Sequence, residues 1–510
     1  MSTESLSPRI GDLVAAVATR QPDAPALVVT ADHVPLAYRD LVRLVDDLAG
    51  RLTRGGLLSG DRVALRAASN AEFVVGLLAA SRADLIVVPL DPALPVDDQR
   101  ARGEAAGARV VLVDDASESK LPSWRIAVSV GEHPAVQLGT STPPNPATSA
   151  PAGLGPDDAM IMFTGGTTGL PKMVPWTQAN IAASVRAIIA EYGLGPQDAT
   201  VAVMPLYHGH GLIAALLSTL ASGGAVVLPA RGRFSAHTFW EDIDAVGATW
   251  YTAVPTIHQI LLERDRTESA ERHPAALRFI RSCSAPLTPE TAQALHDVFS
   301  APVVCAFGMT EATHQVSTTS VESDENPAAT AGLVGRSTGP EIRISASDGQ
   351  PLPQGEVGEV WLHGPTVVRG YLGDPAITAA NFTDGWLRTG DLGSLSDEGD
   401  LTIRGRIKEL INRGGEKISP ERVEGVLASH PDVLEVAVFA VPDKLYGETG
   451  AAAIVPRGSA APSSEELAQF CRERLAAFEV PSSFRETSAL PHTAKGSLDR
   501  RAVAEQFGGA

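Results

Sequence analysis

The residues with the clearest chemical potential form one short segment, T-G-G-T-T-G-L-P-K, at residues 164–172. Its glycines let the backbone bring N–H groups close to an anion, and its threonines add hydroxyl donors. These small residues are Thr164, Gly165, Gly166, Thr167, Thr168 and Gly169. Lys172 adds a positive charge at the end of the segment. A solvated turn would explain the glycines, but not the preceding apolar run Met160–Phe163, which is typical of a buried strand. We therefore predict a phosphate-binding loop, distinct from the Walker pattern G-x-x-x-x-G-K-S/T, which is absent.

Polar side chains also follow two other predicted strands. Ser282 and Ser284 stand at the end of one apolar run, and Thr310 and Glu311 stand at the end of another. Ligands of open α/β sheets bind beyond the carboxyl ends of the strands. We therefore expect one site assembled from several loops that are distant in the sequence.

The composition limits the classes of protein that fit. A chain of 510 residues exceeds one ordinary core and predicts two or more domains. Its net charge of −19 argues against binding to nucleic acid or to an anionic membrane surface. No apolar run is long enough to span a bilayer, and the N-terminus lacks a signal-peptide pattern. The three cysteines have no metal-ligand spacing and predict no disulfide framework, so we expect a reducing, cytoplasmic compartment.

The first two thirds of the chain alternate strand and helix patterns, which predicts an α/β fold with a large N-terminal domain of doubly wound parallel sheets. The predicted strands are Ala26–Thr30, Asp61–Leu65, Leu85–Leu90, Val110–Val113, Ala225–Leu228, Trp250–Ala253, Arg278–Ser282 and Val303–Phe307. The predicted helices include Phe73–Ala83, Thr256–Glu263 and Pro289–Phe299. Residues 136–157 are rich in Pro, Ser, Thr and Gly and predict a surface loop.

The pattern changes after Gly332. Glu356–His363 and Asp400–Arg404 alternate apolar and polar residues, as expected for antiparallel strands of a small barrel-like subdomain or sheet. After Arg406 the predicted elements form a small α+β unit. They are helices Pro420–Ser429 and Ser464–Phe478 and strands Val433–Val441 and Ala451–Val455. We predict an N-terminal domain of residues 1–406 and a mobile C-terminal domain of residues 407–510.

The chain resembles the adenylate-forming superfamily of acyl-CoA synthetases, adenylation domains and luciferases. Five separated motifs carry this resemblance, in the order typical of the family. They are T-G-G-T-T-G-L-P-K, A-F-G-M-T-E (Ala306–Glu311), G-W-L-R-T-G-D (Gly385–Asp391), G-R-I-K-E (Gly405–Glu409) and P-H-T-A-K-G (Pro491–Gly496). Five ordered motifs are highly specific, although each alone would be weak.

Two positions of the phosphate loop depart from the family pattern. Gly165 stands where the family usually has Ser, and Met173 stands where it usually has Gly. The first change removes a hydroxyl donor but keeps the backbone donors, so we expect ATP binding to be retained.

The resemblance implies that a carboxylic acid attacks the α-phosphate of ATP, releasing pyrophosphate and forming an acyl-adenylate. Charge neutralisation at the phosphates is the main catalytic requirement of this step. By resemblance, Lys495 bridges the carboxylate and the α-phosphate, Glu311 ligates Mg²⁺, and Thr310 contacts the α-phosphate or the ion.

The resemblance also assigns the nucleotide contacts. The phosphate loop is expected to hold the β- and γ-phosphates, Phe307 to stack on adenine, and Asp391 to accept hydrogen bonds from the ribose, with Arg406 nearby. The other residues expected at the nucleotide are Ser284, Ala285, Pro286, Ala306, Gly308 and Met309. Taken singly, Asp391 would be read as a turn residue, Glu311 as a helix-start carboxylate and Arg406 as a surface ion-pair partner.

In the second half-reaction a thiol attacks the acyl-adenylate. The resemblance implies that the C-terminal domain swings about Lys408, which in a static protein would be a solvated strand-end lysine. By the same resemblance, this swing of the C-terminal domain brings Gly414, Gly415 and Lys417 to coenzyme A. Loading of a carrier protein in place of coenzyme A is the alternative.

In this superfamily the acyl pocket is lined by certain segments, and the matching segments of this sequence carry several polar residues. These are His208, His210, Ser282, Ser284, His314 and Gln315. We expect His208, Ser284 and a protonated His314 to bind the substrate. Segments such as Trp250–Ile260 and Arg278–Ala285 closely resemble oxalate–CoA ligases of plants and fungi. Oxalate is therefore the predicted acid, and a short- or medium-chain fatty or aryl acid is the alternative.

Overall fold

The computed structural model describes most of the chain. The described residues are 9–29, 31–115, 119–140, 142–146, 149–164, 171–267, 277–322, 330–458, 461–493 and 498–508. Residues 165–169 of the predicted phosphate loop and Lys495 lie outside the described residues, so their predicted roles stay predictions.

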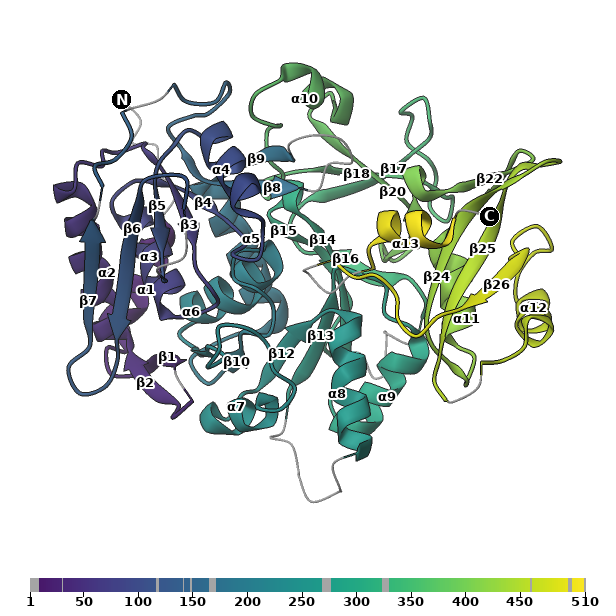
Figure 1. Cartoon of the computed structure of the whole chain (residues 1–510), viewed down its shortest axis with the longest axis horizontal. Coiled ribbons are helices and arrows are strands. Elements are labelled where there is room, and N and C mark those ends of the chain that lie inside the picture. Colours follow the sequence, from purple (N-terminus) through teal and green to yellow (C-terminus); the bar gives the residue numbers. More distant parts are fainter. Residues whose placement is uncertain are drawn as a thin grey trace.

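The first sheet contains seven strands in the order β7-β6-β5-β3-β4-β8-β9. Its five central strands, β6, β5, β3, β4 and β8, are parallel to one another. The edge strands β7 and β9 each pair with their neighbour in the antiparallel direction. The bounds are β3 Arg62–Arg66, β4 Ile86–Pro89, β5 Ala108–Val113, β6 Ser123–Ser129, β7 Ala135–Thr140, β8 Asp158–Thr164 and β9 Lys172–Thr177. Helices α1 (Ile10–Arg20), α2 (Tyr38–Arg54), α3 (Ala71–Arg82) and α4 (Val96–Ala105) belong to this part of the chain. Figure 1 shows them around the first sheet.

The second sheet has fourteen strands and joins the parallel and antiparallel parts of the chain. Its parallel strands are β1 (Pro25–Val29), β11 (Ala225–Val227), β10 (Ala199–Val201), β12 (Trp250–Ala253), β13 (Phe279–Cys283) and β14 (Val303–Met309). The helices along this stretch are α5 (Gln178–Tyr192), α6 (Ser218–Ser222), α7 (Phe239–Val246), α8 (Pro255–Thr267) and α9 (Pro289–Phe299). The prediction of a doubly wound α/β fold is confirmed.

The antiparallel strands continue the second sheet without a closed barrel among the described residues. They are β2 (Val34–Ala37), β15 (His314–Thr318), β16 (Leu333–Ser337), β17 (Glu341–Ser345), β18 (Gly358–His363), β19 (Phe382–Thr383), β20 (Trp386–Leu395) and β21 (Leu401–Arg406). Pairing of β14 with β15 links the strands from β15 to β21 to the parallel strands. Of the two predicted forms, a barrel-like subdomain or a sheet, the structure has the sheet.

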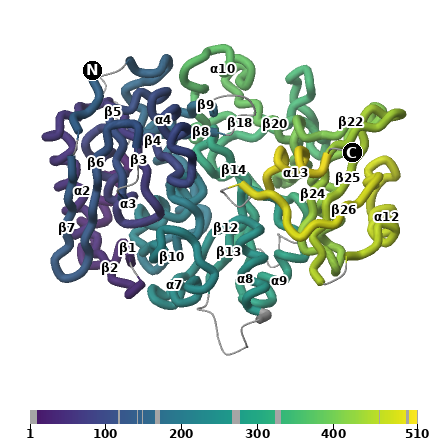
Figure 2. The backbone as a smooth tube through the Cα atoms, viewed as in Figure 1, coloured from purple at the N-terminus to yellow at the C-terminus, as the bar shows by residue number. Residues whose placement is uncertain are grey.

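The last hundred residues form a separate five-stranded sheet, drawn in green to yellow in Figure 1 and Figure 2. Its strands are β22 (Ile411–Arg413), β23 (Glu416–Ile418), β24 (Val433–Asp443), β25 (Gly447–Pro456) and β26 (Ser483–Glu486). Helices α11 (Pro420–Ala428), α12 (Ser464–Arg472) and α13 (Arg500–Phe507) complete this unit. The predicted boundary at residues 406–407 lies where β21 ends and a short 3₁₀ turn, Ile407–Glu409, begins.

The predictions differ most from the structure at β7 and at α12. Strand β7 falls almost entirely within the segment predicted as a loop. The prediction missed it because most of its side chains are exposed and only Val136 is buried. Helix α12 ends at Arg472, six residues before the predicted end. Beyond it, the Glu479 carboxylate accepts a hydrogen bond from the Ala476 N–H at 2.9 Å, which replaces a helical partner.

Candidate active site

Strand β14 positions the predicted adenine and magnesium segment. Its register with β15 shifts between Phe307 and Gly308. A Cβ atom on Gly308 would lie 1.7 Å from the His314 carbonyl oxygen, so only glycine permits this approach of the two strands. The shift carries Thr310 and Glu311 into a 3₁₀ turn (Thr310–Ala312) just past the strand. Thr310 is held there because Trp176 Nε1 donates to its carbonyl oxygen at 2.7 Å.

Glu311 is connected to Lys172 through one tyrosine. The Tyr371 hydroxyl donates to Glu311 Oε1 at 2.8 Å, and Lys172 Nζ lies 3.4 Å from the same hydroxyl. Lys172 also donates to Asn381 Oδ1 at 3.1 Å and lies 4.5 Å from the centre of the Tyr371 ring. Burial lowers the pKa of Lys172, Glu311 raises it, and Lys408 lowers it. The structure therefore brings the predicted phosphate-loop lysine, the predicted metal ligand and the predicted hinge lysine into one electrostatic neighbourhood.

Tyr371 and Asn381 have no signal in the sequence. They lie outside the five motifs, in the segment around α10 (Pro375–Asn381). Their contacts with Glu311 and Lys172 join residues 60 and 209 positions apart, which only the fold brings together.

Strands β8 and β9 anchor the predicted phosphate loop at both ends. Thr164 is the last residue of β8, Lys172 is the first of β9, and the two are Cα partners across the antiparallel pair. The two ends of the predicted phosphate loop are therefore held next to each other in the sheet.

Asp391 and Arg406 face each other across strands β20 and β21. Arg406 Nε lies 2.9 Å from Asp391 Oδ1, and the Asp391 side chain is only 3% exposed. Burial raises the pKa of Asp391 to about 6, and Arg406 opposes that rise. Asp391 Oδ2 is buried and accepts no hydrogen bond from the described residues. A buried carboxylate oxygen without a partner is costly, so its geometry fits a ligand that supplies hydroxyl donors.

Ser284 and two histidines form the predicted acyl wall. Ser284 follows β13 with φ of 73°, and Ala285 and Pro286 continue the chain from it. Its hydroxyl lies 3.1 Å from His210 Nδ1, and the rings of His210 and His314 stack with centroids 5.2 Å apart. His314 itself has φ of 83°. Non-glycine residues in this conformation are strained and gather at functional sites.

His210, for which the sequence predicts no binding role, is a histidine that contacts Ser284. The His208 ring packs against Tyr207 with centroids 4.8 Å apart, and its predicted role in substrate binding stays a prediction. Burial and the Arg281 guanidinium hold the pKa of His314 well below its usual range, and its protonation in the substrate complex stays a prediction. Arg281 therefore supplies the positive charge that we had expected from the histidine.

The predicted hinge and coenzyme A residues lie at the start of the C-terminal unit. Lys408 is exposed in the 3₁₀ turn after β21. Gly414 and Gly415 form the two-residue turn between β22 and β23, with φ of 59° and 99°. Such a turn favours glycine at both positions, so this hairpin alone explains the pair. Lys417 is exposed and its ammonium donates to Asn412.

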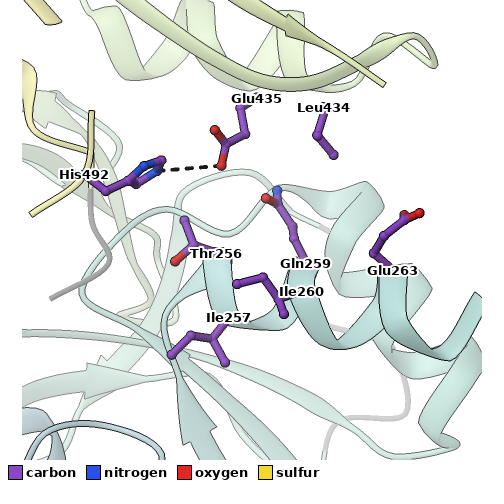
Figure 3. Close-up of a pocket in the computed structure, with 8 residues that line it drawn as sticks. All are labelled: Thr256, Ile257, Gln259, Ile260, Glu263, Leu434, Glu435 and His492. Carbon is purple, nitrogen blue, oxygen red and sulfur yellow. Dashed lines mark ion pairs between the residues drawn. The ribbon is translucent and has the colours of Figure 1, made fainter. Parts of the chain in front are cut away.

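A cavity of about 420 Å³ lies between α8 and the C-terminal sheet (Figure 3). Its lining residues are Thr256, Ile257, Gln259, Ile260, Glu263, Leu434, Glu435 and His492. His492 Nε2 lies 3.6 Å from Glu435 Oε1 across the edge of the cavity. The segment that leads to Lys495 is thereby placed at the junction of the two parts of the chain.

The sequence matches the family model of AMP-binding enzymes over residues 14–372 and that of their C-terminal domain over residues 422–497. The chain belongs to the AMP-binding enzyme family. It is 41% identical to an oxalate–CoA ligase of Arabidopsis thaliana, covering 98% of this chain and 99% of the relative. It is 34% identical to an oxalate–CoA ligase of Saccharomyces cerevisiae, covering 95% of each.

Among solved structures, it is similar to o-succinylbenzoate coenzyme A synthetase (MenE) from Bacillus subtilis in complex with ATP and magnesium ion. The TM-score is 0.80 at 29% identity, covering 96% of this chain and 98% of that chain. The prediction of an AMP-forming acid–CoA ligase that uses ATP, Mg²⁺ and coenzyme A is confirmed by these matches. Within the described residues, no helix has the length and apolar character needed to cross a bilayer.

Proposed function

We propose that this AMP-binding enzyme is an oxalate–CoA ligase. The observation that carries the proposal is the acyl wall, where Ser284, His210 and His314 meet around a buried arginine, in place of an apolar tunnel. A fatty acyl tail against such groups would leave them without hydrogen-bond partners, at a cost of about 1–3 kcal/mol for each. A second carboxylate beside the reacting one needs donors once it loses water. The two related oxalate–CoA ligases support the same acid.

In the first half-reaction, one oxalate oxygen attacks the α-phosphorus of ATP, and the bond from that phosphorus to the bridging oxygen of pyrophosphate breaks. Lys172 and the loop of residues 164–169 bind the leaving phosphates. Lys495 stabilises the negative charge shared by the attacking carboxylate and the α-phosphate. Asp391 holds the ribose through its buried Oδ2, which has no hydrogen-bond partner among the described residues.

Thr310 and Glu311 fit a magnesium ion, which prefers one or two carboxylates together with substrate phosphates and water. Glu311 is 7% exposed, and among the described residues its side chain forms a hydrogen bond only with Tyr371, through one of its two oxygens. When bound, Mg²⁺ neutralises phosphate charge. Tyr371 orients the Glu311 carboxylate, and Lys172 lies behind the same hydroxyl.

In the second half-reaction, the thiolate of coenzyme A attacks the oxalyl carbon and AMP leaves with the electron pair of the broken bond. We infer that residues 407–510 rotate as a unit about Lys408 for this step. The exposed position of Lys408 between the two sheets supports a hinge. Gly414, Gly415 and Lys417 then form the edge that meets coenzyme A, since the turn places small residues and a cation at the tip of a hairpin.

A short- or medium-chain fatty or aryl acid is the alternative substrate, and a carrier protein is the alternative acceptor. The buried polar wall favours oxalate over either class of acid. We also keep the expectation of a reducing, cytoplasmic compartment, because Cys283, Cys305 and Cys471 are all buried free thiols.

Product analysis tests the proposal. Purified protein with MgATP, coenzyme A and oxalate should form oxalyl-CoA, AMP and pyrophosphate in equal amounts. Mass spectrometry of the thioester and chromatography of the nucleotides measure all three. Formation of ADP, or of AMP without a thioester, would contradict it, and a control without coenzyme A should show only oxalate-dependent exchange of pyrophosphate into ATP.

A further inference from the structure

Arg281 is a fully buried cation behind the acyl wall. It lies on β13, and its side chain is 0% exposed. Five side chains accept hydrogen bonds from its guanidinium at 2.9–3.3 Å: Tyr192, Thr252, His210, His314 and Gln315. None of them is a carboxylate, and no acidic residue of the described chain forms an ion pair with it. A buried charge without a counter-ion is costly to the fold, which suggests that its partner is a ligand.

The guanidinium also determines where the two histidines carry their protons. Arginine only donates hydrogen bonds, so a ring nitrogen facing it must be unprotonated. Arg281 Nη1 lies 3.3 Å from His210 Nε2, and Nη2 lies 3.2 Å from His314 Nε2. Both neutral rings therefore carry their proton on Nδ1.

This tautomer fixes the direction of the hydrogen bonds at the wall. His210 Nδ1–H donates to the Ser284 hydroxyl at 3.1 Å, which leaves the Ser284 proton to be donated elsewhere. Thr252 accepts from Arg281 at 3.0 Å and donates to His210 Nε2 at 2.6 Å, which reinforces the same arrangement. The positive charge of Arg281 polarises this chain of donors towards the exposed Ser284.

We propose that Arg281 is a positioning residue that holds His210 and His314 in the Nδ1–H tautomer and balances the second carboxylate of a dicarboxylate substrate. The substrate half of this inference rests on the proposed function, whereas the tautomer half does not. Arg281 acts through the histidines of the acyl wall, so its loss changes acid binding far more than nucleotide binding.

Kinetics of Arg281→Met test the substrate half. The KM for oxalate should rise about tenfold or more, since a charge-assisted network is lost. The KM for ATP should stay within about twofold. Arg281→Lys retains the charge and should recover part of the oxalate KM. Arg186→Met removes an exposed arginine from α5 and is the matched control, with wild-type constants expected. Equal rises in the two KM values, or no rise for oxalate, would overturn the charge-balancing role.

Ring-nitrogen NMR of ¹⁵N-histidine-labelled protein tests the tautomer half, whichever acid proves to be the substrate. Wild-type protein should show two buried rings protonated on Nδ1, assigned by His210→Gln and His314→Gln. Those signals should change in Arg281→Met and persist in Arg186→Met. Protonation on Nε2 in the wild type would refute the positioning role. If oxalate is not turned over at all, the proposed function fails while this result still decides the tautomers.

Discussion

The carboxylate of Asp391 should strengthen nucleotide binding and weaken the fold at the same pH. Its side chain is 3% exposed, and burial raises its pKa from 3.8 to about 6. Between these values the folded state binds more protons than the unfolded state, so stability is lost as pH rises through about 6. From about pH 5 to about pH 8, ionisation should remove roughly 1.5 kcal/mol of unfolding free energy. The ionised form is also the acceptor that the ribose hydroxyls require.

Asp391→Asn removes this ionisation and isolates its effect. The unfolding free energy of wild type, relative to this variant, should fall by about 1.5 kcal/mol from about pH 5 to about pH 8. Urea unfolding followed by tryptophan fluorescence at both pH values measures the difference. The exposed Asp397→Asn is the control and should follow wild type. AMP affinity should drop about tenfold in Asp391→Asn at the higher pH. An identical pH dependence in wild type and Asp391→Asn would refute the reasoning.

Three further variants separate the steps of the reaction. Lys495→Ala should abolish adenylation but spare thioester formation from supplied acyl-adenylate; equal losses in the two assays would remove its role. Lys408→Pro restricts φ at the hinge and should slow coenzyme A transfer while adenylation is retained. Unchanged rates of both steps would contradict domain alternation about Lys408. Tyr371→Phe removes the hydroxyl between Glu311 and Lys172 and should lower the adenylation rate about tenfold at fixed Mg²⁺. A magnesium titration unchanged from wild type would contradict that last expectation.

The parts of the fold that the sequence predicts are those where burial imposes a pattern. Strands β12, β13 and β14 are apolar runs ended by polar residues, and their predicted bounds agree with the structure within two residues. Strand β7 was not predicted because most side chains of an exposed edge strand do not have to be apolar. The pairing of β15 with β16 could not be predicted either, since pairing between strands that are distant in the sequence leaves no local pattern.

The candidate site divides in the same way. Residues within ordered motifs, such as Glu311 and Asp391, could be named in advance because the five motifs together resemble those of a known family. Arg281 could not, because in the sequence it is one arginine within a strand, and its burial depends on partners from four other elements. The low pKa of His314 could not be predicted for the same reason. The choice of which group carries the charge depends on desolvation, which the fold determines.

Substrate preference is the measurement that tests the central claim most directly. Values of kcat/KM should be compared for oxalate, malonate, acetate, octanoate and 4-coumarate with saturating MgATP and coenzyme A. Oxalate should exceed every other acid by about a hundredfold or more, because a compact dianion best matches the polar wall of Ser284, His210 and His314. A preference for octanoate or 4-coumarate would contradict the account of the acyl wall.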